Sequence, residues 1–277
     1  MFRRAVLTLL FSAAIGAAQA EAPLERGSYL VNTIMTCGNC HSPKGPPPAV
    51  AGKDFSGGLR FESPAFDVTA SNITSDKATG IGSWSATDIK KLLRDNVRPN
   101  GVPLVVMPTA FYGIITPADL DAIVAYVQSI KAVSNKVVDP VYKMPDQHQI
   151  FPGAEKPADP ATFGDKVKYG FYLATIGHCM DCHTPRVRGL LDFGNIGAGG
   201  QQFPGPWGVS VSRNITSSKT KGIGGWTDAE IKRAMTQGID KDGNKLTGPM
   251  GFAYYARMTD ADLDAVIAWL RTVPAKD

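Results

Sequence analysis

Two short segments of the chain combine thiols and an imidazole at one fixed spacing. Residues 37–41 and 179–183 both read C-x-x-C-H, and together they hold every cysteine of the sequence: Cys37, Cys40, Cys179 and Cys182. This spacing is the attachment signature of c-type haem. The two thiols add to the two vinyl groups of the porphyrin, and the adjacent histidine then reaches the iron. The sequence therefore predicts two covalently bound haem c groups, with His41 and His183 as iron ligands.

Three other roles for paired cysteines fit the sequence less well than haem attachment does. Four cysteines in an exported chain could form two disulfides in three possible connectivities, but the adjacent histidines would then have no role. Two C-x-x-C pairs could bind zinc, but here 138 residues separate Cys40 from Cys179. A redox-active pair of the thioredoxin type is usually single and accompanies a βαβ pattern, which this sequence does not contain.

The first 20 residues have the features of a secretory leader. Arg3 and Arg4 precede an apolar stretch over residues 5–15, and Ala18-Gln19-Ala20 matches the cleavage site. Covalent haem attachment takes place outside the bacterial cytoplasm, so export agrees with the C-x-x-C-H motifs. No later segment reaches the roughly 18 consecutive apolar residues of a membrane span. We therefore expect a periplasmic protein, soluble or peripheral to the membrane.

The charge of the chain gives little guidance to its partners. The formal net charge is +4, and no long run of like charge occurs. This balance favours neither nucleic acid nor a strongly charged partner surface.

The sequence repeats itself at an offset of 142 or 143 residues. Besides the C-x-x-C-H motifs, Asn72-Ile73-Thr74 recurs as Asn214-Ile215-Thr216, and residues 80–84 recur at 222–226. We therefore predict two modules of one fold, residues 21–135 and residues 165–277. Residues 136–164 contain five prolines and no apolar periodicity, which is typical of a linker.

Helical signals recur in both modules. An apolar helix leads into each haem motif, and a middle helix begins after each tryptophan, with Ser85 and Asp88 or Thr227 and Glu230 as capping boxes. The last helix of each module has one apolar face, formed by Leu120, Ile123, Val124, Val127 and Ile130, or by Leu263, Val266, Ile267, Leu270 and Val273. The fold is predicted to be mainly α, with a thin core that a buried haem would fill.

One methionine in each module is placed to be the second axial ligand of the iron. Met107 and Met250 each stand nine residues before an N-cap threonine, Thr116 and Thr259, so they are equivalent positions of the repeat. A thioether ligand occupies the remaining coordination position of the iron, raises its reduction potential and favours electron transfer. The other methionines have no such counterpart, lie in the linker or lie between haem cysteines. His148 remains an alternative ligand for one iron.

Each half resembles a class I cytochrome c module, with C-x-x-C-H after a first helix, then a methionine loop and a last helix. The N-I-T and G-I-G-x-W segments, followed by Met-Pro or Pro-Met, are similar to the multihaem cytochrome c subunits of bacterial membrane-associated dehydrogenases. Subunits for alcohols, gluconate and aldehydes are the best-known examples. They usually carry three haem motifs, whereas this chain has two and no obvious C-terminal membrane helix.

The resemblance implies a dihaem electron carrier without catalytic residues of its own. It would pass single electrons from a periplasmic dehydrogenase towards the respiratory chain, with a dehydrogenase subunit, a terminal oxidase or another cytochrome as partner. The alternative is a dihaem oxidoreductase of the peroxidase or thiosulfate dehydrogenase type. That class, like a sensing module, requires an open iron, and a methionine in both halves argues against one.

Overall fold

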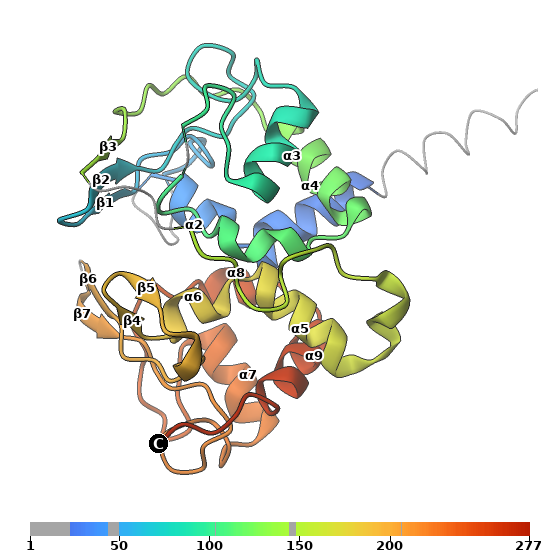
Figure 1. Ribbon diagram of the computed structural model, residues 1–277, viewed down its shortest axis with the longest axis vertical. Coiled ribbons are helices and arrows are strands. Elements are labelled where there is room, and N and C mark those ends of the chain that lie inside the picture. The colour runs from blue at the N-terminus through green and yellow to red at the C-terminus, as the bar shows by residue number, and fades with distance from the viewer. Residues whose placement is uncertain (1–22, 44–49, 103, 144–147, 206) are drawn as a thin grey trace, which may run out of the picture.

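The regular structure of the chain is mainly helical, as the sequence predicts, and the helices form two lobes that follow each other along the chain (Figure 1). The computed structural model describes residues 23–43, 50–102, 104–143, 148–205 and 207–277. The predicted leader, residues 1–20, lies outside these described residues. None of the described helices is long and apolar enough to cross a bilayer.

The two halves contain matching helices in the same order. The first half consists of a helix over residues 23–29 that continues as a π-helix, η1 (Leu30–Ile34), then α2 (Cys37–His41), α3 (Ala86–Asp95), η2 (Thr109–Ile114) and α4 (Pro117–Ser129). The second half consists of α5 (Lys166–Ile176), α6 (Cys179–His183), α7 (Asp228–Gln237), α8 (Phe252–Tyr255) and α9 (Asp260–Leu270). A short 3₁₀ helix, η3 (Pro160–Gly164), leads into α5, and another, η4 (Phe193–Asn195), follows α6.

Local sequence signals explain where the middle helices begin. The Ser85 hydroxyl accepts a hydrogen bond from the Asp88 amide, and the Asp88 carboxylate accepts one from the Ser85 amide. Thr227 and Glu230 form the same reciprocal pair at the start of α7. Each box satisfies backbone N–H groups that have no partner within the helix. Both predicted capping boxes are confirmed.

The first and last helices of each half cross at very short range. A Cβ atom on Gly27 would lie only 2.0 Å from the carbonyl oxygen of Ala122 in α4. A Cβ atom on Gly170 would lie 1.8 Å from the carbonyl oxygen of Ala265 in α9. Only glycine allows backbones to approach this closely. The two crossings use equivalent positions of the repeat, and the predicted apolar faces of α4 and α9 supply most of the buried side chains around them.

Three small antiparallel sheets lie beside the helices, and the sequence reasoning did not predict them. β1 (Arg60–Glu62), β2 (Phe66–Thr69) and β3 (Val141–Tyr142) form one sheet in that order. β4 (Arg186–Val187) pairs with β5 (Leu190–Leu191), and β6 (Gln202–Gly205) pairs with β7 (Gly208–Val211). Side chains of all three sheets line the large cavity described below.

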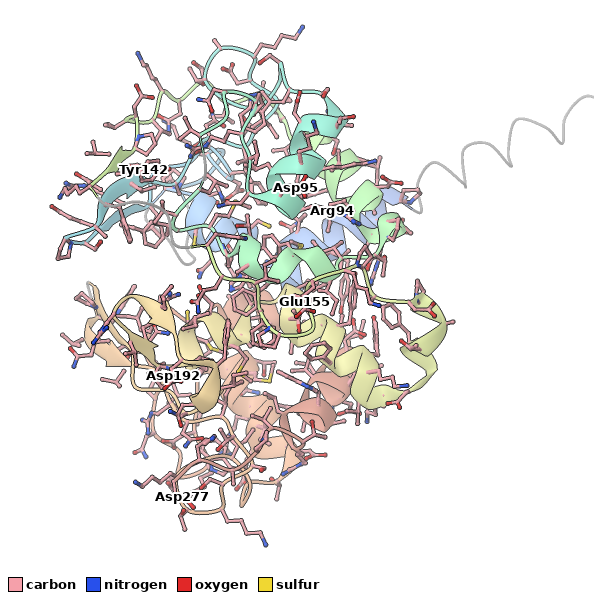
Figure 2. The ribbon with its side chains drawn as sticks, in the orientation of Figure 1. Arg94, Asp95, Tyr142, Glu155, Asp192 and Asp277 are labelled. Carbon is pink, nitrogen blue, oxygen red and sulfur yellow. The ribbon has the colours of Figure 1, made fainter. Side chains whose placement is uncertain are left out.

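The segment predicted as a linker packs against both halves where it is described. Tyr142, which is labelled in Figure 2, pairs with Phe66 of the first half, and Phe151 stacks on Phe111 with 4.8 Å between ring centroids. Gln149 exchanges two hydrogen bonds with the backbone of Leu191 in the second half. The buried apolar residues of the two halves accordingly form one continuous core.

Candidate haem sites

The four cysteines lie on two equivalent single-turn helices. The residues before them, Thr36 and His178, both have left-handed backbone conformations, with φ of 48° and 44°. This turn brings α2 and α6 sharply away from the preceding helices. All four thiols are free, so the disulfide alternative is not what the structure contains. Among the described residues, no group of three or more His, Cys, Asp or Glu side chains is arranged to hold a metal ion.

Burial keeps the cysteines uncharged. It raises the pKa of Cys37 to about 12 and that of Cys40 to about 11. In the second motif it raises the pKa of Cys179 to about 12 and shifts that of Cys182 in the same direction. Neutral sulfur in an apolar pocket suits a thioether bond to a porphyrin.

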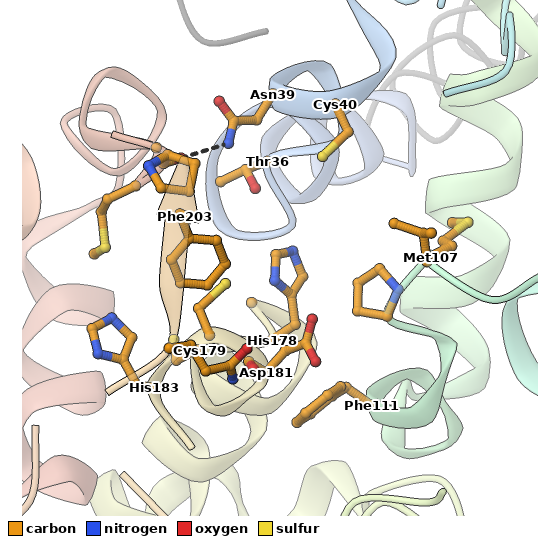
Figure 3. Close-up of a pocket in the computed structure, with 18 of the residues that line it drawn as sticks. Thr36, Asn39, Cys40, Met107, Phe111, His178, Cys179, Asp181, His183 and Phe203 are labelled. Carbon is orange, nitrogen blue, oxygen red and sulfur yellow. Dashed lines mark hydrogen bonds between the residues drawn. The ribbon is translucent and has the colours of Figure 1, made fainter. Parts of the chain in front are cut away.

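Both motifs open into one continuous cavity of about 2120 Å³. A pocket for one drug-sized ligand occupies roughly 300–1,000 Å³, so this cavity has room for two large cofactors. Its lining includes every site residue that the sequence predicts: Cys37, Cys40, His41, Met107, Cys179, Cys182, His183 and Met250. Figure 3 shows Cys40 of α2, Met107 of the loop before η2, and Cys179 and His183 of α6 in the lining of this pocket.

Each motif histidine is oriented by a backbone carbonyl. Nδ1 of His41 lies 2.7 Å from the Ser71 carbonyl oxygen, and Nδ1 of His183 lies 2.7 Å from that of Arg213. A carbonyl only accepts, so Nδ1 carries the proton and donates it, which leaves the Nε2 lone pair free for a metal. Burial lowers the pKa of both imidazoles, despite the opposite effect of the carbonyls, and this favours the neutral ring that a metal requires.

The two carbonyls were not identified from the sequence, although a signal for them exists. Ser71 and Arg213 directly precede the repeated N-I-T triplets. The side-chain oxygen of Asn72 accepts hydrogen bonds from the Thr74 amide and hydroxyl, and the side-chain amide of Asn72 donates to Val133 O at 2.8 Å. Asn214 bonds Thr216 in the same way and donates to Lys276 O at 2.7 Å. The triplet thus fixes the loop whose carbonyl orients the histidine.

The two methionines occupy matching loops. Met107 precedes η2 and Met250 precedes α8, and both side chains are partly buried against the core. Asn96 holds the first loop, since its amide donates to Leu104 O and its carbonyl oxygen accepts from Leu104 N and from the Thr109 hydroxyl. Two other histidines, His148 and His178, line the same cavity. His148 is exposed, whereas the His178 ring packs edge-on against Tyr112 with 6.5 Å between centroids.

These residues fit a covalently held haem in both halves. Each half supplies two neutral thiols on one helical turn, a histidine whose Nε2 is free, and a thioether in the lining of the same apolar cavity. Soft sulfur and imidazole ligands suit iron in a porphyrin.

Comparison with known proteins agrees with this arrangement. The cytochrome c family matches residues 167–274. The gluconate 2-dehydrogenase cytochrome c subunit of Pantoea cypripedii is 30% identical over 98% of this chain and 64% of its own length. The fructose dehydrogenase cytochrome subunit of Gluconobacter japonicus is 30% identical over 91% of this chain and 53% of its own length.

A shorter relative matches along most of its length. The dihaem cytochrome c-type protein of Cereibacter sphaeroides is 28% identical over 86% of this chain and 82% of its own length. By contrast, the chain spans only about three fifths of the gluconate and alcohol dehydrogenase subunits that it matches. The chain therefore carries a cytochrome c domain and is a relative of dehydrogenase cytochrome c subunits and of a dihaem cytochrome c.

Proposed function

We propose that the chain is a dihaem electron carrier built from two tandem cytochrome c modules, residues 21–135 and 165–277. The observation that carries this proposal is the pairing of ligands in both halves. Each carbonyl-oriented histidine, His41 or His183, shares its cavity with a methionine at an equivalent position, Met107 or Met250. A bound haem supplies reversible one-electron chemistry at its iron.

The protein's own contribution would be to hold two ligands for each iron. The Ser71 and Arg213 carbonyls fix the two imidazoles, so neither ring reorients when the charge at the iron changes. Met107 and Met250 would hold the two irons as thioether ligands, which would leave no coordination site for a small substrate. Such an arrangement favours electron transfer over ligand chemistry, and it requires no catalytic side chain.

The partners follow from the named relatives rather than from the site. Several relatives are cytochrome subunits of gluconate, alcohol or fructose dehydrogenases. We infer that this chain accepts electrons from a periplasmic dehydrogenase and passes them towards the respiratory chain, through a terminal oxidase or another cytochrome. Export by residues 1–20 would place it in the periplasm, soluble or peripheral to the membrane.

Absorption spectroscopy of the purified holoprotein tests this function. Two haems per chain and the weak far-red charge-transfer band of methionine-ligated ferric haem are expected. The band should fall by about half in Met107→His or in Met250→His and vanish in the double variant. A high-spin haem in the unmodified protein, or turnover of peroxide, would instead support the oxidoreductase alternative.

A further inference from the structure

A side chain from the first haem motif reaches the methionine loop of the second half. Asn39 lies between Cys37 and Cys40, and its Nδ2 atom donates a hydrogen bond to the Pro249 carbonyl oxygen at 3.0 Å. Pro249 directly precedes Met250 in the sequence. The dashed line in Figure 3 marks this bond, which joins segments 210 residues apart.

The residue after Met250 meets the same helical turn. A Cβ atom on Gly251 would lie 3.3 Å from Cγ2 of Thr36, the residue just before Cys37. The Thr36 side chain also lies close enough to Tyr255, in α8, to affect the pKa of that hydroxyl. The Met250 segment is therefore contacted on both sides by the first half of the chain.

The reverse contact is weaker, so the two halves are not equivalent here. Asp181 occupies the position of Asn39 in the second motif, but it forms an ion pair with Arg186 of its own half, 2.5 Å away. The Met107 loop leads into η2, where Tyr112 makes an edge-on contact with His178 of the second half. Its hydrogen bonds come from Asn96, within the first half.

We propose that Asn39 is a positioning residue for the sixth iron ligand of the second haem. It holds the Met250 segment in place from the first half, so the strength of methionine ligation at one site depends on the attachment helix of the other. This inference rests on the proposed function, because it assumes that Met250 binds iron. We propose no comparable role for Asp181.

Competition by imidazole measures how firmly each methionine is held. In Met107→His only the second haem retains methionine ligation, so the far-red band reports that site alone. Adding Asn39→Leu, which keeps the volume but removes the amide, should raise the apparent affinity of the oxidised protein for imidazole roughly 2- to 12-fold. That range corresponds to the net worth of one neutral hydrogen bond. Asn39→Gln, which keeps an amide donor, should restore part of the difference.

The Met250→His background provides the internal control, because there the band reports the first haem alone. Asn39→Leu should leave imidazole binding unchanged in that background. Asn135→Leu is the matched control in the Met107→His background, since the Asn135 amide donates to Ser56 O within the first half. If Asn39→Leu prevents haem attachment, as haem content per chain would reveal, Asn39→Ala serves as the second variant.

Different outcomes would overturn the role of Asn39 and methionine ligation at the second site. An unchanged affinity in the Met107→His background, or an equal change in both backgrounds, would overturn the role of Asn39. Absence of the far-red band from Met107→His without any further substitution would instead refute methionine ligation at the second site, and with it the proposed function.

Discussion

The hydroxyl of Tyr29 donates a 2.5 Å hydrogen bond to the carboxylate of Asp262, across the boundary between the two halves. The Tyr172 hydroxyl, in the second half, donates the equivalent hydrogen bond to the Asp119 carboxylate, in the first half. The two tyrosines are equivalent in the repeat, and so are the two aspartates. Each half therefore presents the same patch to the other, as the subunits of a twofold-symmetric dimer do.

Removing either hydroxyl should weaken the contact between the halves. A hydrogen bond to a charged group contributes about 1.5–3 kcal/mol, so Tyr172→Phe should lower the free energy of unfolding by an amount in that range. Asp119 keeps its ion pair with Arg26, which prevents a larger loss. Denaturant titration of the holoprotein measures the change. Tyr126→Phe, which loses only a neutral bond from Asn32, should have the smaller effect, and equal losses would contradict this account.

Adding one methyl group at a helix crossing should destabilise the half that contains it. Gly170→Ala places a Cβ atom against the Ala265 carbonyl, so α5 and α9 must separate. Overpacking of this kind costs roughly 1–3 kcal/mol. Thermal unfolding followed by circular dichroism provides the measurement. Gly164→Ala, where no atom lies within 4 Å of the added carbon, is the control and should leave the midpoint nearly unchanged.

The N-I-T loops should contribute to both stability and the haem sites. Asn214→Ala removes the bond to Lys276 O and both bonds to Thr216, and it frees the loop that carries the Arg213 carbonyl. We expect lower stability, by about 1–3 kcal/mol, together with a changed reduction potential of one haem. Spectroelectrochemical titration distinguishes the two effects. Gln237→Ala, at an exposed position of α7 outside the cavity lining, is the control and should alter neither quantity.

Acid should destabilise the protein through His178. Burial lowers the pKa of His178 below its ordinary value of 6.5, although Asp181 and the Met35 carbonyl act in the opposite direction. The unfolded chain therefore binds a proton that the folded chain resists, and stability falls as the pH drops below about 6.5. Above that pH both states are neutral and the contribution is constant. In His178→Gln, unfolding measured between pH 7 and pH 5 should depend less steeply on pH.

The sequence alone predicted the elements that obey local rules. The capping boxes at Ser85 and Thr227 and the buried faces of α4 and α9 depend on residues only three or four positions apart. The boxes were correct, and so were the faces except at their ends, because Ile130 and Val273 lie beyond the last residues of the two helices. The repeat also selected Met107 and Met250 as candidate ligands, because equivalent positions can be compared without a structure, and both side chains line the cavity.

What the sequence did not reveal depends on contacts between distant segments. The carbonyls of Ser71 and Arg213 carry no side-chain signature, and the Asn39–Pro249 bond joins residues from different halves. Residues 136–164 have the composition of a free linker, yet Phe151 is only 2% exposed because Phe111 and Phe171 surround it. Composition indicates how a segment behaves in isolation, but it does not indicate which neighbouring surfaces of the folded protein the segment packs against.

The joining of two matching halves in a single chain has a consequence for how the sites can differ. In an assembly of two identical subunits, every substitution appears at both sites. Here the counterpart of Thr36 is His178, and the counterpart of Asn39 is Asp181. Equivalent positions within and next to the two C-x-x-C-H motifs therefore carry different chemistry. A linked pair can keep a symmetric framework, through contacts such as Tyr29–Asp262, while its two centres acquire separate properties. Such a molecule can give an electron a preferred direction, which a symmetric dimer cannot do.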